Sequence, residues 1–245
     1  MIDMDSRLRV ARGIAKTETE ASREVFQTLQ DRGHPDAPPP TMSDGWGGIT
    51  EAMIDVYGQV PAYSGQGRPP TRKQAQADWQ YLQFIKHRDE HGRLLSTELR
   101  VIFGEPDVVL ALFGQSTAYV ERTHLTMRLF NGRLVRQTLG FSKNLACYRA
   151  SAAWEDAVYN LVRPLKTLRQ AVADQPGRRW QPRTPAVAAG LTDHIWTFKE
   201  LLTTVASPNT YEGDYRIRPN IQMGRARQHA TMAQMGGPMG EPHAG

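Results

Sequence analysis

Cysteine is almost absent from this chain, and long apolar runs are absent altogether. The single cysteine, Cys147, excludes an internal disulfide framework and any zinc site built from several cysteines. It falls in an apolar helical pattern, which predicts a buried structural thiol rather than a nucleophile. No apolar run approaches the roughly eighteen residues that span a bilayer. Residues 1–5 lack the basic and then apolar order of a secretion signal. We therefore expect a cytoplasmic protein with no membrane partner.

Acidic residues are scarce in the middle of the chain. Between Glu121 and Arg183 there are twelve Lys and Arg against four Asp and Glu, a net charge of +8, whereas the whole chain carries +5. Such a concentration of positive charge favours a polyanionic partner, most commonly a nucleic acid. A pair of solvated basic helices with no partner remains the alternative. The 245 residues, 40% of them hydrophobic, are enough for one good core.

The N-terminal half predicts alternating strands and helices. Alternating apolar residues predict two strands within residues 1–15, and Thr17 or Thr19 can cap a helix that runs to about Asp31. A short strand and glycine-rich turn at 41–48 and a helix at 49–57 follow. This β-β-α-β-α order is typical of a mixed sheet with helices packed against it.

The next part predicts a basic surface loop, a β-hairpin and helices. Gly, Pro, Arg and Gln dominate the loop, and turn-forming residues separate the two hairpin strands. The expected elements are the loop at 63–76, strands at 78–86 and 94–103, a short helix at 105–113, a helix at 118–128 and a long helix at 141–162.

The C-terminal part predicts less regular structure. Residues 174–183 read as a linker, and Thr184 begins a turn or short helix. Residues 192–196 can cap a helix to about Leu202, which makes His194 a neighbour of the cap rather than a metal ligand. From Ser207 onward six Gly and four Pro among 39 residues, without periodicity, predict a disordered tail.

Two carboxylates stand out as candidates for metal chemistry. On the helix expected at 118–128, Glu121, His124 and Arg128 share one face, although an exposed helix often carries such residues without a role. Asp44 follows a short strand, where a plain turn aspartate is the alternative. Two carboxylates from separate elements are how two-metal phosphoryl-transfer sites are assembled, and hard oxygen ligands favour Mg²⁺ or Mn²⁺.

Four segments, in this order and spacing, carry a family resemblance. They are residues 117–128, 140–143, 159–169 and 184–196. Together with the Asp44 region they resemble bacterial insertion-sequence transposases of the DDE type, and most closely the insertion sequence one family. The resemblance covers most of residues 1 to about 205.

The resemblance implies an RNase H-like core that cuts and joins DNA at the ends of a mobile element. Asp44 matches the second acid of the catalytic triad and Glu121 the third. Arg128 matches the basic residue after that glutamate, which contacts DNA near the scissile phosphate. The expected cofactor is Mg²⁺ or Mn²⁺. The residues expected to bind DNA are Arg122, Arg128, Arg133, Lys143, Arg163, Lys166 and Arg169.

The chain also departs from the family pattern. Leu165 stands where many relatives have a histidine. The first strand and its aspartate are expected before Met1, and Asp3 and Asp5 are weak substitutes. We expect a partial catalytic core at 1–173 with an insertion at about 58–116, a C-terminal extension at 174–206 and the tail at 207–245.

The sequence therefore predicts a DDE transposase, or its second reading-frame or truncated product, that is inactive as this isolated chain. Its expected partners are duplex DNA at element ends and target, and further copies of itself in a dimer or larger synaptic assembly. A non-catalytic DNA-binding or regulatory remnant is the main alternative. A general metal-dependent nuclease is weaker, because the ordered transposase motifs argue against it.

Overall fold

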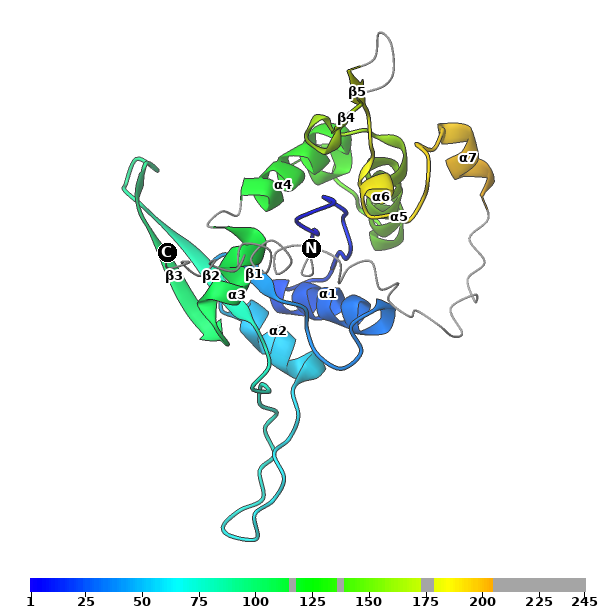
Figure 1. Cartoon of the computed structure of the whole chain (residues 1–245). Helices are drawn as coiled ribbons and strands as arrows, with labels where there is room; N and C mark the ends of the chain where they lie inside the picture. Colours follow the sequence, from blue (N-terminus) through cyan, green and yellow to red (C-terminus); the bar gives the residue numbers. More distant parts are fainter. Residues whose placement is uncertain (115–117, 136–138, 173–178, 205–245) are drawn as a thin grey trace, which may run out of the picture. The chain divides into compact units, whose positions relative to one another are not determined.

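The computed structural model describes residues 1–114, 118–135, 139–172 and 179–204. The chain divides after Ala206 into two units, and all of these residues lie in the first. The tail expected from Ser207 and the first half of the linker expected at 174–183 lie outside the described residues. The described part of the chain contains both helices and strands (Figure 1). This confirms a mixed α/β protein with a small mixed sheet and flanking helices.

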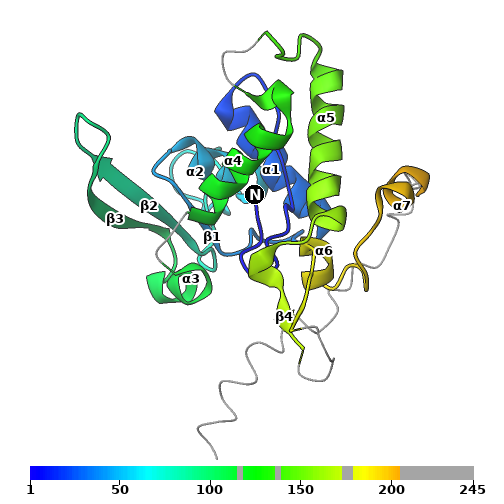
Figure 2. The same cartoon turned by 90° about the horizontal axis from the view of Figure 1, so that it is seen from above.

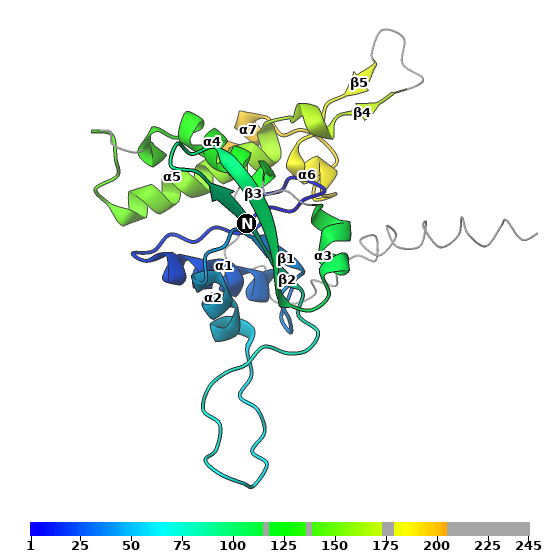
Figure 3. The same cartoon turned by 90° about the vertical axis from the view of Figure 1, so that its left-hand side faces the viewer.

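The first helices and the first sheet strand form where the sequence predicts them. Helix α1 (Glu18–Arg32) begins at Thr17, whose hydroxyl accepts a hydrogen bond from the Glu20 amide at 3.2 Å. Strand β1 (Thr41–Ser43) and helix α2 (Gly48–Tyr57) follow. Figure 3 shows α1 and α2 lying side by side.

The main core lies where α1 and α2 pack against the start of strand β2 (Tyr81–Arg88). Aromatic rings meet edge to face there, with centroids 6.4 Å apart for Phe26 and Tyr57 and 6.3 Å apart for Tyr57 and Trp79. This geometry adds to the stabilisation that burial of apolar area provides. The buried cluster consists of Phe26, Leu29, Ala52, Met53, Tyr57, Trp79 and Tyr81.

The sheet has the order β1-β2-β3, with β1 parallel to β2 and β3 (Leu94–Phe103) antiparallel to it. The first four residues of β2 are all buried, so both faces of that strand are covered there. Helix α3 (Pro106–Phe113) packs against β1 and β2. The predicted hairpin is therefore confirmed. Its far end is open to solvent, where Leu95 is 69% exposed.

The predicted basic loop between α2 and β2 is also confirmed, and Figure 3 shows it extending away from α2. Gln59 and Gln74 close its base through two backbone hydrogen bonds of 3.1 and 2.9 Å. Most of the residues between them are exposed.

Helices α4 (Ala118–Phe130) and α5 (Leu145–Ala157) dominate the next segment (Figure 2). Asn131 joins them, because its side chain accepts a hydrogen bond from the Ser151 hydroxyl at 3.1 Å. Helix α5 starts four residues later than the sequence predicts, and it continues into a π-helical turn, η2 (Val158–Val162). The short elements are η1 (Gly132–Leu134), η3 (Lys166–Leu168), β4 (Gln170–Ala171), β5 (Trp180–Gln181), α6 (Pro185–Ala188) and α7 (Phe198–Thr203).

Two predictions in this segment are wrong. Helix α7 is capped by Thr197 and not by residues 192–196, because only Thr197 has a glutamate three positions later to complete a capping box, Glu200. Cys147 is exposed and not buried, because it lies on the solvent side of the first turn of α5. His194 is hydrogen bonded to Asp193 and Glu200, which agrees with its expected place beside the cap.

The predicted pair of N-terminal strands is also wrong. Only an isolated antiparallel bridge joins Ile2 and Arg9, around a tight turn. The backbone of Arg9 pairs instead with a side chain far along the chain. Its amide donates to Asn160 Oδ1 at 3.0 Å, and its carbonyl accepts from Asn160 Nδ2 at 3.0 Å.

Ion pairs also hold the N-terminal turn against α5. The side chain of Arg9 is only 3% exposed, and its guanidinium lies 2.6 Å from Glu155 and 3.1 Å from Asp156 of α5. Arg12 reaches the same two carboxylates, at 3.2 and 2.5 Å. We call these four side chains the arginine clamp. A buried arginine is tolerated only when it is paired in this way.

None of the helices in the described ranges is long and apolar enough to cross a membrane.

Replacing Asn160 by Ala should free the N-terminal turn. The change leaves the amide and carbonyl of Arg9 without partners, and should cost about 1–3 kcal/mol of unfolding free energy. Urea unfolding measures the loss, and faster hydrogen exchange at the Arg9 amide localises it. As a control, Gln27→Ala removes an exposed hydrogen-bonded amide and should change stability by less than about 0.5 kcal/mol. Equal effects of the two changes would contradict the clamped turn.

Candidate functional site

Asp44 and Glu121 line the same cavity, although 76 residues separate them in the chain. The cavity measures about 400 Å³. Asp44 comes directly after β1, and Glu121 lies in the first turn of α4. Met1 and Ile2 of the N-terminal turn contribute to the wall, together with His124. The structure thus brings together the two carboxylates that the sequence singles out.

Asp44 is exposed and belongs to a tight turn. Its Oδ1 accepts a hydrogen bond of 3.4 Å from the Trp46 amide. A Cβ on the following Gly45 would come within 3.0 Å of the Ile85 side chain, so the absence of a side chain lets this turn lie against β2. Trp46, two residues after Asp44, is half-buried and lines a second cavity of about 560 Å³, which Asp44 also lines.

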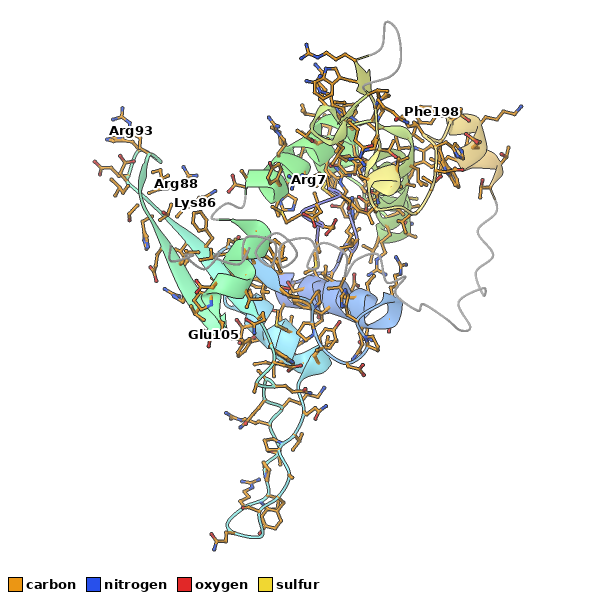
Figure 4. The ribbon with its side chains drawn as sticks, in the orientation of Figure 1. Arg7, Lys86, Arg88, Arg93, Glu105 and Phe198 are labelled. Carbon is orange, nitrogen blue, oxygen red and sulfur yellow. The ribbon has the colours of Figure 1, made fainter. Side chains whose placement is uncertain are left out.

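Glu121 is balanced by a cation from the sheet. Lys86 Nζ of β2 lies 2.5 Å from Glu121 Oε1, and the glutamate side chain is 59% exposed. The position of Glu121 near the start of α4 further favours its negative charge. Figure 4 shows Lys86 on the hairpin with Arg88 and Arg93 farther along it. The sequence did not single out Lys86, whose only local signal is its place at the end of the strand predicted at 78–86.

His124 lies one turn after Glu121 and lines both cavities. Partial burial lowers the pKa of its imidazole below the usual value, and nearby positive charges, including Arg128, lower that pKa further. Arg128 itself lines the larger cavity, which Asp44 shares. The neutral imidazole is therefore the favoured form near neutral pH.

The other residues expected to bind DNA lie in separate places. Arg122, Arg163 and Lys166 line a third cavity of about 160 Å³. The Arg133 guanidinium donates to the Ser142 hydroxyl at 2.9 Å, and the Arg169 guanidinium lies 4.2 Å from the ring centroid of Trp180. Lys143 is exposed just before α5. The structure brings three of the seven together and disperses the rest.

Asp44 and Glu121 offer carboxylate oxygens, the hard ligands that Mg²⁺ and Mn²⁺ prefer. Magnesium is commonly held by one or two carboxylates, with water and substrate phosphates completing its shell. Among the described residues, no cluster of three or more His, Cys, Asp or Glu could hold a metal ion. Asp44 and Glu121 are therefore the residues that would hold one here, and Lys86 would compete with it for Glu121.

No family model, curated protein or solved structure matches the chain. The residues that line these cavities, and their geometry, are therefore what indicates a function for this chain.

Replacing Lys86 by Met should strengthen metal binding in this cavity. The change removes the cation that competes for Glu121, and an exposed ion pair is worth up to about 1 kcal/mol, so Mn²⁺ should bind up to about fivefold more tightly. Electron paramagnetic resonance of free Mn²⁺ measures the affinity. In the matched control, Lys73→Met, the lost ammonium bonds the Asp55 carbonyl outside the cavity. An unchanged or weaker affinity for Lys86→Met would mean that Lys86 does not compete.

Acid should destabilise the protein partly through His124. Its pKa is lower in the folded than in the unfolded chain. The unfolded chain therefore takes up a proton first as the pH falls below the ordinary histidine pKa of about 6.5. The neutral ring's contribution is complete above that pH and is lost as the pH falls through the folded pKa. Urea unfolding between pH 7 and pH 5 should show a smaller loss of stability for His124→Gln than for the wild type. Equal losses would exclude this effect.

Proposed function

We propose that this protein acts in DNA transposition, as a DDE-type transposase similar to the insertion sequence one family, with an RNase H-like core. Its activity would be the metal-dependent cleavage and joining of DNA strands at element ends. The observation that carries the proposal is that Asp44 and Glu121, the two acids matched to the family, line one cavity. A chance match on two unrelated surface carboxylates would not require both to line one cavity.

The chemistry follows from the residues around this cavity. A divalent ion held by Asp44 and Glu121 would activate the attacking water or 3′-hydroxyl and offset charge at the phosphate. Arg128, on the adjoining cavity, is available to bind a phosphate oxygen. Duplex DNA at element ends and target is the proposed partner, together with further copies of this chain in a synaptic assembly.

Asp3 and Asp5 are poor candidates for a third acid. The carboxylate of Asp3 accepts hydrogen bonds from the amide and hydroxyl of Ser6, which ties it into its own turn. Within the described part of the chain, neither aspartate is among the residues that line the Asp44 and Glu121 cavity. We therefore propose that the chain by itself binds metal and DNA but cleaves poorly.

A non-catalytic DNA-binding or regulatory role is the second candidate. The observation in its favour is the ion pair between Lys86 and Glu121, which satisfies the carboxylate without a metal. Under this reading the basic side chains keep their role and the acids have become structural.

Metal binding tests the proposal. Mn²⁺ should bind the wild-type chain, and both Asp44→Asn and Glu121→Gln should weaken that binding by about tenfold or more, because each removes one charged ligand. The controls make the same chemical changes at exposed positions outside the cavity, Asp36→Asn and Glu90→Gln. If all four variants bound Mn²⁺ like the wild type, the metal site would be refuted.

Nicking of supercoiled DNA with Mg²⁺ or Mn²⁺ separates the two candidates. The transposase proposal expects any nicking, even if weak, to be lost in Glu121→Gln. Salt-sensitive DNA binding that is unaffected by Glu121→Gln, with no cleavage under any condition, would favour the regulatory role. Robust cleavage that is abolished by Asp3→Asn would show that Asp3 serves as a third acid.

A further inference from the structure

The cavity of about 160 Å³ is lined by four cations from three parts of the chain. Arg7 comes from the N-terminal turn, Arg122 from α4, and Arg163 and Lys166 from the segment around η3. Figure 4 shows Arg7 beside α4. The rest of the lining is apolar or carries hydroxyl groups, and no carboxylate belongs to it among the described residues. The cavity is thus a concentrated positive site.

These four charges are not neutralised by the protein. Within the described ranges, none of Arg7, Arg122, Arg163 and Lys166 forms a salt bridge. The arginine clamp nearby behaves differently, because both of its arginines meet carboxylates. Like charges that are held together without counter-ions repel one another, so an anion would be bound favourably here.

Arg7 is held in place at an energetic cost. Its φ is 61°, in the left-handed region that non-glycine residues seldom adopt. Its guanidinium lies 3.3 Å from the ring centroid of Tyr119, and its Nε is buried with no hydrogen-bond acceptor. The guanidinium also makes a weak contact of 3.8 Å with the Met4 sulfur. Backbone strain and an unsatisfied buried donor both cost free energy, so a folded chain keeps them only where other interactions offset that cost. A bound anion would supply the missing acceptor for the Arg7 guanidinium.

Stacking prepares a second guanidinium in the same cavity. Arg163 lies 4.0 Å from the ring centroid of Phe130. A guanidinium that is stacked on a ring keeps its N–H groups at its edge, where they match the oxygens of a phosphate. The cavity is smaller than the roughly 300–1,000 Å³ of pockets that bind drug-sized ligands. A single tetrahedral oxyanion fits it better than a whole nucleotide.

We propose that Arg7, Arg122, Arg163 and Lys166 form a binding site for one phosphate group, supplied by the backbone of a DNA strand. That this phosphate belongs to DNA rests on the proposed function. Ile2 lines both this cavity and the cavity of Asp44 and Glu121, and the consecutive residues Glu121 and Arg122 face the two cavities. A strand that enters the carboxylate cavity can therefore leave a neighbouring phosphate in the basic one.

A double-mutant cycle in EDTA tests this site apart from any metal chemistry. Fluorescence anisotropy of a short labelled duplex would be measured for Arg122→Gln, Lys166→Gln and the double variant. Each single change should weaken binding by about three- to tenfold and lower the salt slope by about one. Because both cations hold one phosphate, the double variant should lose clearly less than the product of the single losses.

Arg169→Gln is the matched control, since Arg169 lies over Trp180 and outside the cavity. Combined with Arg122→Gln, its effect should multiply, because the two sites are independent. Arg122, Lys166 and Arg169 are all exposed, so these variants should keep the wild-type unfolding midpoint. Multiplying losses for Arg122→Gln and Lys166→Gln would overturn the shared phosphate.

Two further measurements separate the possible sources of the phosphate. Duplexes with one neutral methylphosphonate at successive positions should include a position at which Arg122→Gln and Lys166→Gln cause no further loss, and this would assign the site to DNA. If inorganic phosphate alone bound in calorimetry, was lost in both variants, and DNA affinity stayed unchanged, the site would serve free phosphate and the DNA assignment would be wrong. If neither ligand depended on these residues, the site would be refuted. If the chain failed to bind Mn²⁺ or to nick DNA, the measurements in EDTA would still be valid. Failure of the proposed function can therefore be told apart from failure of this phosphate site.

Discussion

The arginine clamp, in which Arg9 and Arg12 meet Glu155 and Asp156, holds the first residues of the chain against α5. Removing either side of a buried pair leaves a charge that water cannot solvate, so the contact tolerates little change. The clamp matters because Met1 and Ile2, a few residues away, form part of the wall of the cavity that Asp44 and Glu121 line. Much of the candidate site therefore depends on a contact that contains none of its acids.

The clamp and one further ion pair neutralise the described acids of the basic segment between Glu121 and Arg183. The segment from Glu121 to Arg183 has four acids of its own. Three of these lie in the described residues, and each pairs with a cation from outside the segment: Glu121 with Lys86, and Glu155 and Asp156 with the clamp. Among the described lysines and arginines of this segment, only Arg149 forms a salt bridge, with Glu24 outside the segment. These cations lie in separate cavities or over aromatic side chains, and they do not form one uniform basic face.

The parts that the sequence predicted well are those with local causes. Thr17 caps α1 through its own neighbours, and turn residues set the β2–β3 hairpin, so periodicity and capping sufficed. The N-terminal strands failed because the backbone of Arg9 pairs with Asn160, 151 positions away, and no local pattern signals such a partner. Asp44 and Glu121 could be singled out from residue type and order, whereas Lys86 and Arg7 matter only through where the fold brings them. The RNase H-like core remains a prediction.

The π-helical turn that follows α5 has a consequence for how this chain can change in evolution. A π turn holds one more residue than an α turn, and such turns often mark functional positions. Losing one residue of this turn ahead of Asn160 would restore a regular α-helix and turn Asn160 by about 100° away from Arg9. Glu155 and Asp156, which precede it, would keep their directions. The helix would be more regular, yet the two hydrogen bonds between the Arg9 backbone and the Asn160 side chain would be lost. We therefore expect length variation to be excluded here.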